Sequence, residues 1–296
     1  MSMRKQLVKT VEHLLSADES VVLLLGDIGV FGFKRAFENF PERTYNIGIL
    51  EAATVSLASG LAKTKLIPII HTIAPFLVER SFEQIKVDFG YQRLGGNFIS
   101  VGASYDYASL GCTHHCPGDV GILQNIPGME ISVPGTAAEF DALFQQSYAN
   151  GHPTYYRLSE RENPESHAIT FGKANVLKKG ASATVVAVGP VLQHVLPAIT
   201  GLDVGLLYYT TVSPFDYQTL RENVPASGKI LLVEPFYSGT LTYHVHQALR
   251  PKPVAIEFVG VPHEFLTNYG RAEDHDECIG LSSKNIRTKL ETLING

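Results

Sequence analysis

The feature that most constrains the fold is a regular alternation of short apolar runs with helical stretches. The apolar runs of the first half predict strands at residues 21–25, 66–70, 98–101 and 154–156. Helical patterns lie between them, at residues 51–64, 76–91 and 137–149. Because a continuous apolar strand must be covered on both faces, this pattern predicts an α/β fold with a mainly parallel sheet.

A polar segment at residues 159–167 interrupts the alternation. It carries charges and an Asn-Pro pair without apolar periodicity, which is typical of a linker. The alternation then resumes, with strands predicted at 184–188, 204–208, 230–233 and 255–259. A chain of 296 residues fits two domains of ordinary size. We therefore expect two doubly wound domains, at residues 1–165 and 175–296.

Charge and composition exclude several classes of function. The formal net charge of −5 gives no basic excess to neutralise phosphates, so we expect no nucleic-acid partner. No apolar run reaches the roughly 18 residues of a membrane span, and the first residues lack a signal-peptide pattern, so no membrane partner is expected. Three cysteines form no disulfide framework, which favours a cytoplasmic location.

Glu51 begins a predicted helix that is rich in small residues. An acidic residue there has a simple explanation, because the helix dipole favours negative charge at this end. The local sequence is more specific than this, because N-I-G-I-L-E at 46–51 is followed by A-S-G-L-A at 58–62. It resembles the R-x-x-x-G-I-x-E…A-A-G-L-A segment of transketolases, deoxyxylulose-phosphate synthases and beta subunits of 2-oxo acid dehydrogenases. The resemblance implies that Glu51 contacts a ring nitrogen of the aminopyrimidine of thiamine diphosphate and helps to activate it, from a desolvated position.

A second segment, at residues 73–85, resembles the F-x-x-R-A-[FY]-D-Q-I helix of the same superfamily. Arg80 matches the arginine of that helix, and the resemblance implies that an aromatic ring just before it stacks on the pyrimidine. Counting directly from Glu51 places Leu77 at this position and Phe76 one residue earlier. Stacking needs a flat ring, which favours Phe76. Phe76, Leu77 and Arg80 are therefore the candidate cofactor contacts, and a plain core role for Phe76 stays open.

A third segment reads L-G-C-T-H-H-C-P at residues 110–117. A zinc site is one interpretation, although the ligands are crowded and no second pair follows at zinc-finger spacing. G-C-T-H also resembles the G-P-T-H of transketolases, and an I-P-G-M segment follows it in the same order. The resemblance implies that His114 handles a substrate hydroxyl proton, for which imidazole is suited near neutral pH. His115 is a weaker candidate for substrate binding.

A fourth segment, H-P-T-Y-Y-R at residues 152–157, resembles the G-P-x-x-x-R strand end of the family. Arg157 is thus a candidate contact for an anionic substrate, with a plain surface cation as the alternative. Residues 179–189 and 260–281 resemble the C-terminal domain of these enzymes, so that the resemblance spans nearly the whole chain.

Two departures bear on substrate and cofactor. Leu110 stands where transketolases have an aspartate, and residues 102–104 replace the region of a phosphate-binding histidine. No G-D-G…N segment is present to hold Mg²⁺ and the diphosphate, so we expect no metal ligands in this chain. The resemblance implies that a separate N-terminal, diphosphate-binding subunit holds them.

These features favour the C-terminal subunit of a split thiamine-diphosphate-dependent transketolase. It is expected to transfer a two-carbon ketol unit between sugar phosphates, and only together with its partner. The implied assembly is a heterotetramer of two plus two chains, with self-dimerisation. A beta subunit of a 2-oxo acid dehydrogenase, a decarboxylating enzyme of the deoxyxylulose-phosphate-synthase type, and a non-enzymatic interaction protein are the alternatives.

Overall fold

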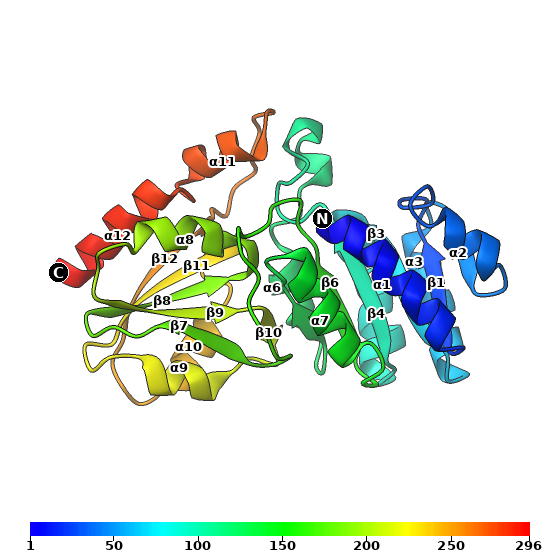
Figure 1. Cartoon of the computed structure of the whole chain (residues 1–296), viewed down its shortest axis with the longest axis horizontal. Helices are drawn as coiled ribbons and strands as arrows, with labels where there is room; N and C mark the ends of the chain where they lie inside the picture. The colour runs from blue at the N-terminus through cyan, green and yellow to red at the C-terminus, as the bar shows by residue number, and fades with distance from the viewer.

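The computed structural model describes residues 1–296 and shows two α/β halves side by side (Figure 1). The first sheet has seven strands in the order β10-β5-β6-β4-β3-β1-β2, and the second has five in the order β12-β11-β8-β9-β7. Only the β10–β5 and β7–β9 pairs are antiparallel. The expected fold class, two α/β domains with mainly parallel sheets, is confirmed.

The first domain contains most strands of the seven-stranded sheet. They are β1 (Val21–Leu25), β2 (Thr44–Asn46), β3 (Ile67–Ile73), β4 (Gly96–Val101), β5 (Glu130–Ser132) and β6 (Pro153–Arg157). Its helices are α1 (Met3–Ala17), α2 (Lys34–Asn39), α3 (Glu51–Lys63), α4 (Ala74–Val78), α5 (Phe82–Gln84), α6 (Asp119–Leu123) and α7 (Ala137–Ser147). Shorter turns are the π-helical η1 (Ile85–Tyr91) and the 3₁₀ turns η2 (Ala108–Leu110) and η3 (Cys112–His114).

The second domain covers its sheet on both faces (Figure 1). Its strands are β7 (Ala174–Lys178), β8 (Ala183–Val188), β9 (Val204–Tyr209), β11 (Lys229–Tyr237) and β12 (Ala255–Val261). The helical elements are η4 (Gly189–Val191), α8 (Leu192–Ala198), α9 (Tyr217–Asn223), α10 (Thr242–Leu249), α11 (Ala272–Ile279) and α12 (Ser283–Asn295). Helices α8 and α12 pack together on one face, and α9 and α10 pack together on the other.

Strand β1 shows why the apolar runs form the centre of the first sheet. All five of its residues are buried, and successive side chains point to opposite faces. Leu23 joins the core under α1 and α7, whereas Leu24 joins the core under α3 and α4. The carboxyl ends of β1, β3 and β4 therefore meet at one edge, which is where the candidate site lies.

Two sequence predictions differ from the structure. The single helix expected at 76–91 is broken into α4, α5 and η1, because Ser81 leaves helical geometry and its hydroxyl donates to the Leu77 carbonyl. Strand β10 (Thr211–Ser213) pairs with β5 in the first sheet, although its residues fall in the range expected for the second domain. The strands β2, β5 and β10 have three residues each, too few for a recognisable apolar run, and β7 mixes polar with apolar residues.

None of the helices reaches the length and hydrophobicity that crossing a lipid bilayer requires.

Candidate active site

Glu51 is the first residue of α3 and lies at the carboxyl edge of the first sheet. Its side chain is only 6% exposed, and Oε1 accepts a hydrogen bond from Arg80 Nη1 at 3.3 Å. Asn46 shapes the loop before it, because Oδ1 accepts from the backbone N–H groups of Asp27 and Gly48 at 3.0 and 3.1 Å. Gly48 has φ +82°, a conformation that other residues rarely adopt. The carboxyl group is thus buried and held at the position that the sequence predicted.

Phe76, Arg80 and His114 form a row that begins at Glu51. The Arg80 guanidinium carbon lies 3.9 Å from the centre of the Phe76 ring. The rings of Phe76 and His114 are 5.2 Å apart, edge to face. His114 is half-buried, and its Nδ1 contacts the Thr113 hydroxyl at 3.0 Å. The structure therefore brings four of the predicted site residues into one continuous row.

Leu77, the other residue predicted to pack on the pyrimidine, lies apart from this row. Its side chain is fully buried in the core under α3 and α4. Phe76 is one residue earlier on α4, so that it points away from this core and keeps part of its ring accessible. The prediction of a cofactor contact by Leu77 is not supported, because a side chain without exposed surface has no face to offer a ligand.

The row has the chemistry that an aminopyrimidine needs. Arg80 places a flat, nitrogen-bearing cation against the Phe76 ring while donating to the Glu51 carboxylate. An aminopyrimidine has the same two properties, a flat face for stacking and ring nitrogens for a carboxyl group. The donor set therefore fits the pyrimidine end of thiamine diphosphate, and the Phe76 face that would suit such a ring is covered by the Arg80 guanidinium.

Arg157 has a different environment from the one expected. Its side chain is 1% exposed, and Nε donates to Asp119 Oδ2 at 2.7 Å. Nη2 donates to the Ser104 hydroxyl at 2.9 Å and to the Pro235 carbonyl at 3.2 Å. The predicted substrate contact is not supported, because the side chain is almost fully buried and protein acceptors hold its Nε and Nη2.

His115 is buried beside His114 but faces another way. Burial lowers the pKa of His115, helped by the neighbouring His275, so the imidazole is neutral at neutral pH. Its Nε2 has no hydrogen-bond partner. The ring lines a small cavity of about 100 Å³, together with Cys112 of its own domain and Phe265 of the second domain. This residue is therefore near the row without being part of it.

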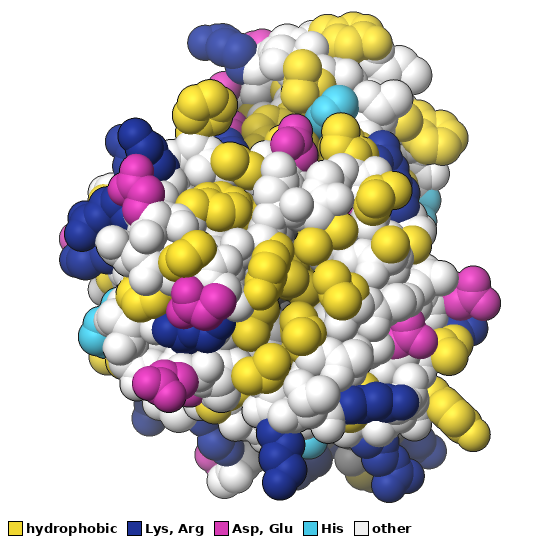
Figure 2. Space-filling view, turned by 90° about the vertical axis from the view of Figure 1, so that its right-hand side faces the viewer, with side chains coloured by type: hydrophobic (Ala, Val, Ile, Leu, Met, Phe, Trp, Pro, Cys, Tyr) yellow, Lys and Arg dark blue, Asp and Glu magenta, His cyan; other side chains and the backbone are white.

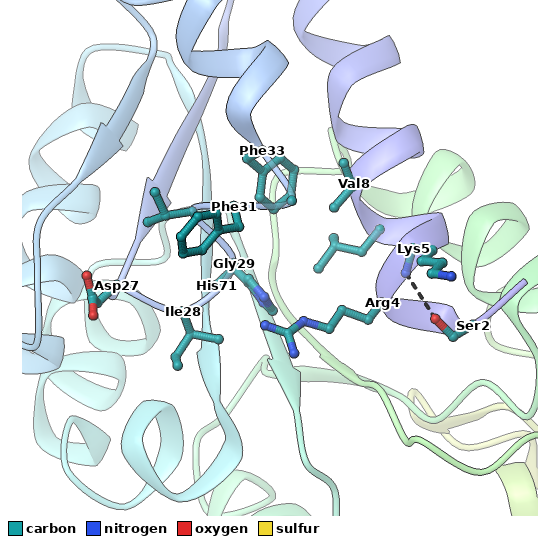
Figure 3. A pocket seen from close by; sticks show the side chains of 13 residues that line it. Ser2, Arg4, Lys5, Val8, Asp27, Ile28, Gly29, Phe31, Phe33 and His71 are labelled. Carbon is teal, nitrogen blue, oxygen red and sulfur yellow. Dashed lines mark hydrogen bonds between the residues drawn. The ribbon is translucent and has the colours of Figure 1, made fainter.

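A larger pocket opens at the same sheet edge, on the side of α1 (Figure 3). It has a volume of about 480 Å³ and is lined by the start of α1, the loop after β1, and His71 of β3. Figure 3 shows the Arg4 side chain extending from α1 toward the His71 ring. Asp27 lines the same pocket and contacts Asn46, so the loop that supports Glu51 also forms this wall.

His71 offers a buried hydrogen-bond acceptor to this pocket. Its Nδ1 is 2.9 Å from the carbonyl of Ile99, and a carbonyl only accepts, so Nδ1 carries the proton. Burial lowers the pKa of His71 to about 4, which keeps the ring neutral. Nε2 is consequently a bare acceptor, and it has no partner in the protein. Sequence reasoning missed both Arg4 and His71; the only available signal was a histidine inside an apolar strand.

The comparisons with known proteins identify the family. The family described as transketolase, pyrimidine binding domain, matches residues 1–165, more than half of the chain. The chain belongs to the transketolase family. It is 36% identical to an uncharacterized 33.6 kDa protein in the fasciation locus of Rhodococcoides fascians, over 96% of this chain and 92% of that protein.

Two further relatives resemble the chain over almost its full length. One of them, a subunit of the apulose-4-phosphate transketolase of Phocaeicola vulgatus, is 28% identical over 97% of this chain and 96% of its own. A solved structure described as a split gene transketolase, inactive beta4 tetramer, has a TM-score of 0.86 at 24% identity, covering 100% of this chain and 98% of that one. The transketolase fold therefore extends through both domains.

Within this transketolase-family chain, no group of three or more His, Cys, Asp or Glu side chains is arranged to hold a metal ion. Cys112, Cys116 and the two histidines between them do not form such a group in the structure.

Proposed function

We propose that this chain is the C-terminal subunit of a split transketolase, which transfers a two-carbon ketol unit between sugar phosphates with thiamine diphosphate. The observation that carries the proposal is the row of Glu51, Arg80, Phe76 and His114 at the carboxyl edge of the first sheet. A buried carboxyl group, a flat ring and a half-exposed imidazole suit the pyrimidine end of this cofactor and the neighbouring chemistry.

The residues of the row have separate roles in this proposal. Glu51 holds a ring nitrogen of the aminopyrimidine, and Phe76 packs against its face. The bound coenzyme supplies the nucleophilic carbon that carries the ketol unit. His114 accepts and returns the proton of a substrate hydroxyl, because an imidazole can do both near neutral pH.

The pocket beside α1 is the proposed place for the sugar. Its volume, about 480 Å³, lies in the usual range of small-molecule sites. Arg4 and Lys5 bring positive charge for an anionic group such as a phosphate. His71 lines the same pocket, and its buried Nε2 is a hydrogen-bond acceptor without a partner in the protein.

A partner chain completes the site in this proposal. The row is open on one side, since the Arg80 side chain is 49% exposed. Apolar side chains gather on the face that Figure 2 views, from the side of β2 and α3. Next to Glu51, Ile49 and Leu50 are 66% and 59% exposed, which is unusual for large apolar residues unless another surface covers them.

We propose that this partner is an N-terminal subunit that holds the diphosphate and its Mg²⁺. Carboxylate and amide oxygens suit that ion, and the row around Glu51 offers it a single carboxylate. Two chains of each kind, with contacts between copies of this chain, form the proposed heterotetramer. The relative from Phocaeicola vulgatus is named as one subunit of a transketolase, which supports an enzyme made of separate chains.

Substitution of Glu51 by Gln tests the proposal in the reconstituted complex. A Gln side chain keeps the shape but removes the acid, so ketol transfer should fall by about 10²- to 10⁴-fold. Glu83→Gln, at an exposed glutamate of α5, is the matched control and should retain activity. Transfer is measured from a ketose phosphate to an aldose phosphate with thiamine diphosphate and Mg²⁺.

Two outcomes of this assay would contradict the proposal. Full activity of Glu51→Gln would remove the role of this carboxyl group. Turnover of pyruvate in place of the ketose phosphate would identify a decarboxylating enzyme of the same superfamily. The chain without its partner should show no transfer, because it supplies only one end of the cofactor site.

A further inference from the structure

The loop that carries His114 is closed at its base. We call residues 104–116 the histidine loop. Its two ends are joined by a β-bridge between Ser104 and Cys116, with the Cys116 N–H donating to the Ser104 carbonyl at 2.7 Å. Because the ends are tied together, whatever holds this base also sets the position of His114 near the other end.

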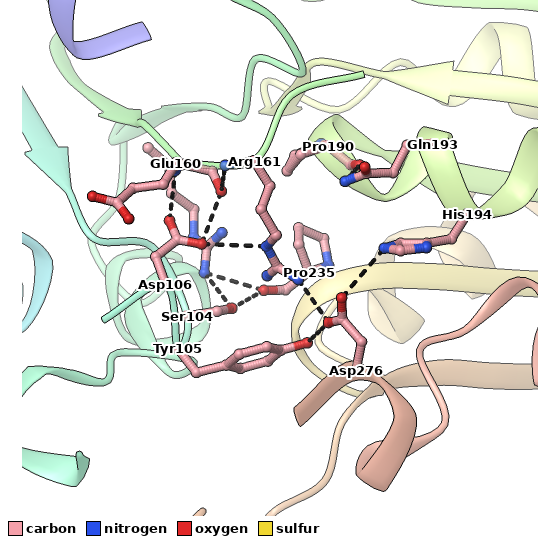
Figure 4. Close-up of polar contacts among 12 residues, drawn as sticks. Ser104, Tyr105, Asp106, Glu160, Arg161, Pro190, Gln193, His194, Pro235 and Asp276 are labelled. Atoms are coloured by element: carbon pink, nitrogen blue, oxygen red, sulfur yellow. Dashed lines mark hydrogen bonds and ion pairs between the residues drawn. The ribbon is translucent and has the colours of Figure 1, made fainter. Parts of the chain in front are cut away.

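The base of the histidine loop is held by a residue of the second domain. The Tyr105 hydroxyl donates to Asp276 Oδ1 at 2.5 Å, and Arg161 Nη1 donates to the same oxygen at 2.6 Å (Figure 4). His194 of α8 lies 3.5 Å from the other oxygen of Asp276. Asp276 is on α11, so its carboxylate joins the histidine loop, the linker and two helices of the second domain.

Arg161 extends this connection to a second carboxylate. Its Nε donates to Asp106 Oδ1 at 3.3 Å, and the guanidinium lies 4.8 Å from the centre of the Tyr105 ring. Asp106 also accepts from the Ser159 hydroxyl and the Glu160 N–H, at 3.0 and 2.9 Å (Figure 4). The residue after Tyr105 is therefore fixed by the linker, and the same guanidinium serves both carboxylates.

The charge balance of this cluster depends on every member. Burial opposes the charge of Asp276, but the neighbouring side chains of His194, Arg161 and Tyr105 hold its pKa below the ordinary value. Removing one member of a buried ion pair leaves an uncompensated charge, which is strongly unfavourable. An uncharged Asn at 276 would hold Tyr105 more weakly, because an amide oxygen is a weaker acceptor than a carboxylate, and it would leave Arg161 with one carboxylate fewer.

The second domain also contacts the part of the histidine loop nearest His114. The His275 ring lies 5.4 Å from the Tyr105 ring and 5.8 Å from the His115 ring. Tyr269 packs so closely on Gly111 that a Cβ there would lie 2.6 Å from its ring. Figure 1 shows α11 and this loop next to each other where the two domains meet. The loop is thus supported along its length by residues 269–276.

From these contacts we infer that Asp276 is a positioning residue, which sets the orientation of His114 through Tyr105 and the closed base of the histidine loop. The inference rests on the proposed function only for the role of His114. It assigns the second domain a part in the site, beyond packing and assembly. The physical reason is that two buried hydrogen bonds at the base of the loop, from Tyr105 to Asp276 and from Ser104 to the Pro235 carbonyl, reach residues of the second domain.

Hydrogen exchange of the isolated chain tests whether Asp276 positions the histidine loop, and it needs no activity measurement. Asp276→Asn should raise amide exchange in residues 105–116 by about tenfold or more, while β8, β9 and β11 keep their protection. Glu277→Gln, the same change at the next, exposed position of α11, is the matched control and should leave exchange unaltered. An equal rise throughout the second domain, or no rise in the loop, would overturn the inference.

Kinetics of the reconstituted complex test the consequence for His114. Asp276→Asn should lower kcat by about 10- to 100-fold, since small displacements of a catalytic group are costly, with the affinity for thiamine diphosphate unchanged. Tyr105→Phe, which keeps the ring and removes one hydrogen bond, should give a smaller effect of the same kind. If Asp276→Asn does not fold, Tyr105→Phe tests the inference in its place.

The two proposals can fail separately. A wild-type complex without ketol transfer would end the proposed function, while the exchange experiment would still decide whether Asp276 positions the loop. Normal kcat in Tyr105→Phe and Asp276→Asn, with an active wild-type complex, would refute the positioning role alone.

Discussion

Two groups of charged residues in this molecule have similar composition and opposite exposure. In the row at Glu51, the Arg80 side chain is 49% exposed and makes one ion pair at 3.3 Å. In the group at Arg157, the side chain is 1% exposed and protein acceptors hold its Nε and Nη2. Both arginines belong to segments that resemble transketolase motifs. A charged group that stays accessible leaves room for a ligand, whereas one that is buried among protein partners stabilises the scaffold.

The largest expected effect separates the two arginines by stability. Arg157→Met leaves the Asp119 carboxylate buried without its partner, so the free energy of unfolding should fall by about 3–5 kcal/mol. Urea unfolding of the isolated chain measures this. The double variant Arg157→Met with Asp119→Leu should recover part of the loss, because the unpaired charge is gone. A loss of under about 1 kcal/mol in the single variant would make Arg157 similar to a surface cation.

A second prediction uses pH to examine the buried acceptor of the pocket. The pKa of His71 is about 4 in the folded protein, below the ordinary value of 6.5. Its contribution to stability is therefore complete above the unfolded pKa and is lost as pH falls from about 6.5 toward 4. Relative to His71→Gln, the wild type should lose about 2 kcal/mol of unfolding free energy between about pH 7 and 5.

Unfolding curves of both proteins at several pH values give this difference directly. A parallel pH dependence of the wild type and His71→Gln would mean that the imidazole is not held neutral. The pocket would then lack the bare acceptor that we assign to Nε2.

The smallest expected effect concerns Arg80, whose guanidinium covers the Phe76 ring. Arg80→Gln should change the free energy of unfolding by less than about 1 kcal/mol, because its ion pair is half exposed. If the guanidinium lies where the pyrimidine would stack, thiamine diphosphate should bind the reconstituted complex somewhat more tightly. Isothermal titration of wild type and variant compares the two. Clearly weaker binding would show that Arg80 holds the cofactor instead of giving way to it.

Much of the fold followed from local patterns. Strand β1 coincides with the predicted run, and α3 starts at Glu51 as expected, because apolar continuity and helix initiation are properties of neighbouring residues. The helix predicted over 76–91 was wrong, since its interruption depends on a hydroxyl of Ser81 and on packing that no periodicity records. Strand β10 was not predicted, because three residues are too few to show a hydrophobic periodicity.

The sequence by itself determined the α/β class and the order of the segments. It also showed a glutamate and a histidine within motifs that resemble those of transketolases. The tertiary structure decided which charged groups stay open. Arg157 donates a hydrogen bond to Asp119, 38 positions away, and Tyr105 donates one to Asp276, 171 positions away. The reason is physical: burial and hydrogen-bond partners arise from contacts between distant segments, and no local pattern encodes whether a polar side chain finds its partner in the protein or leaves it for a ligand.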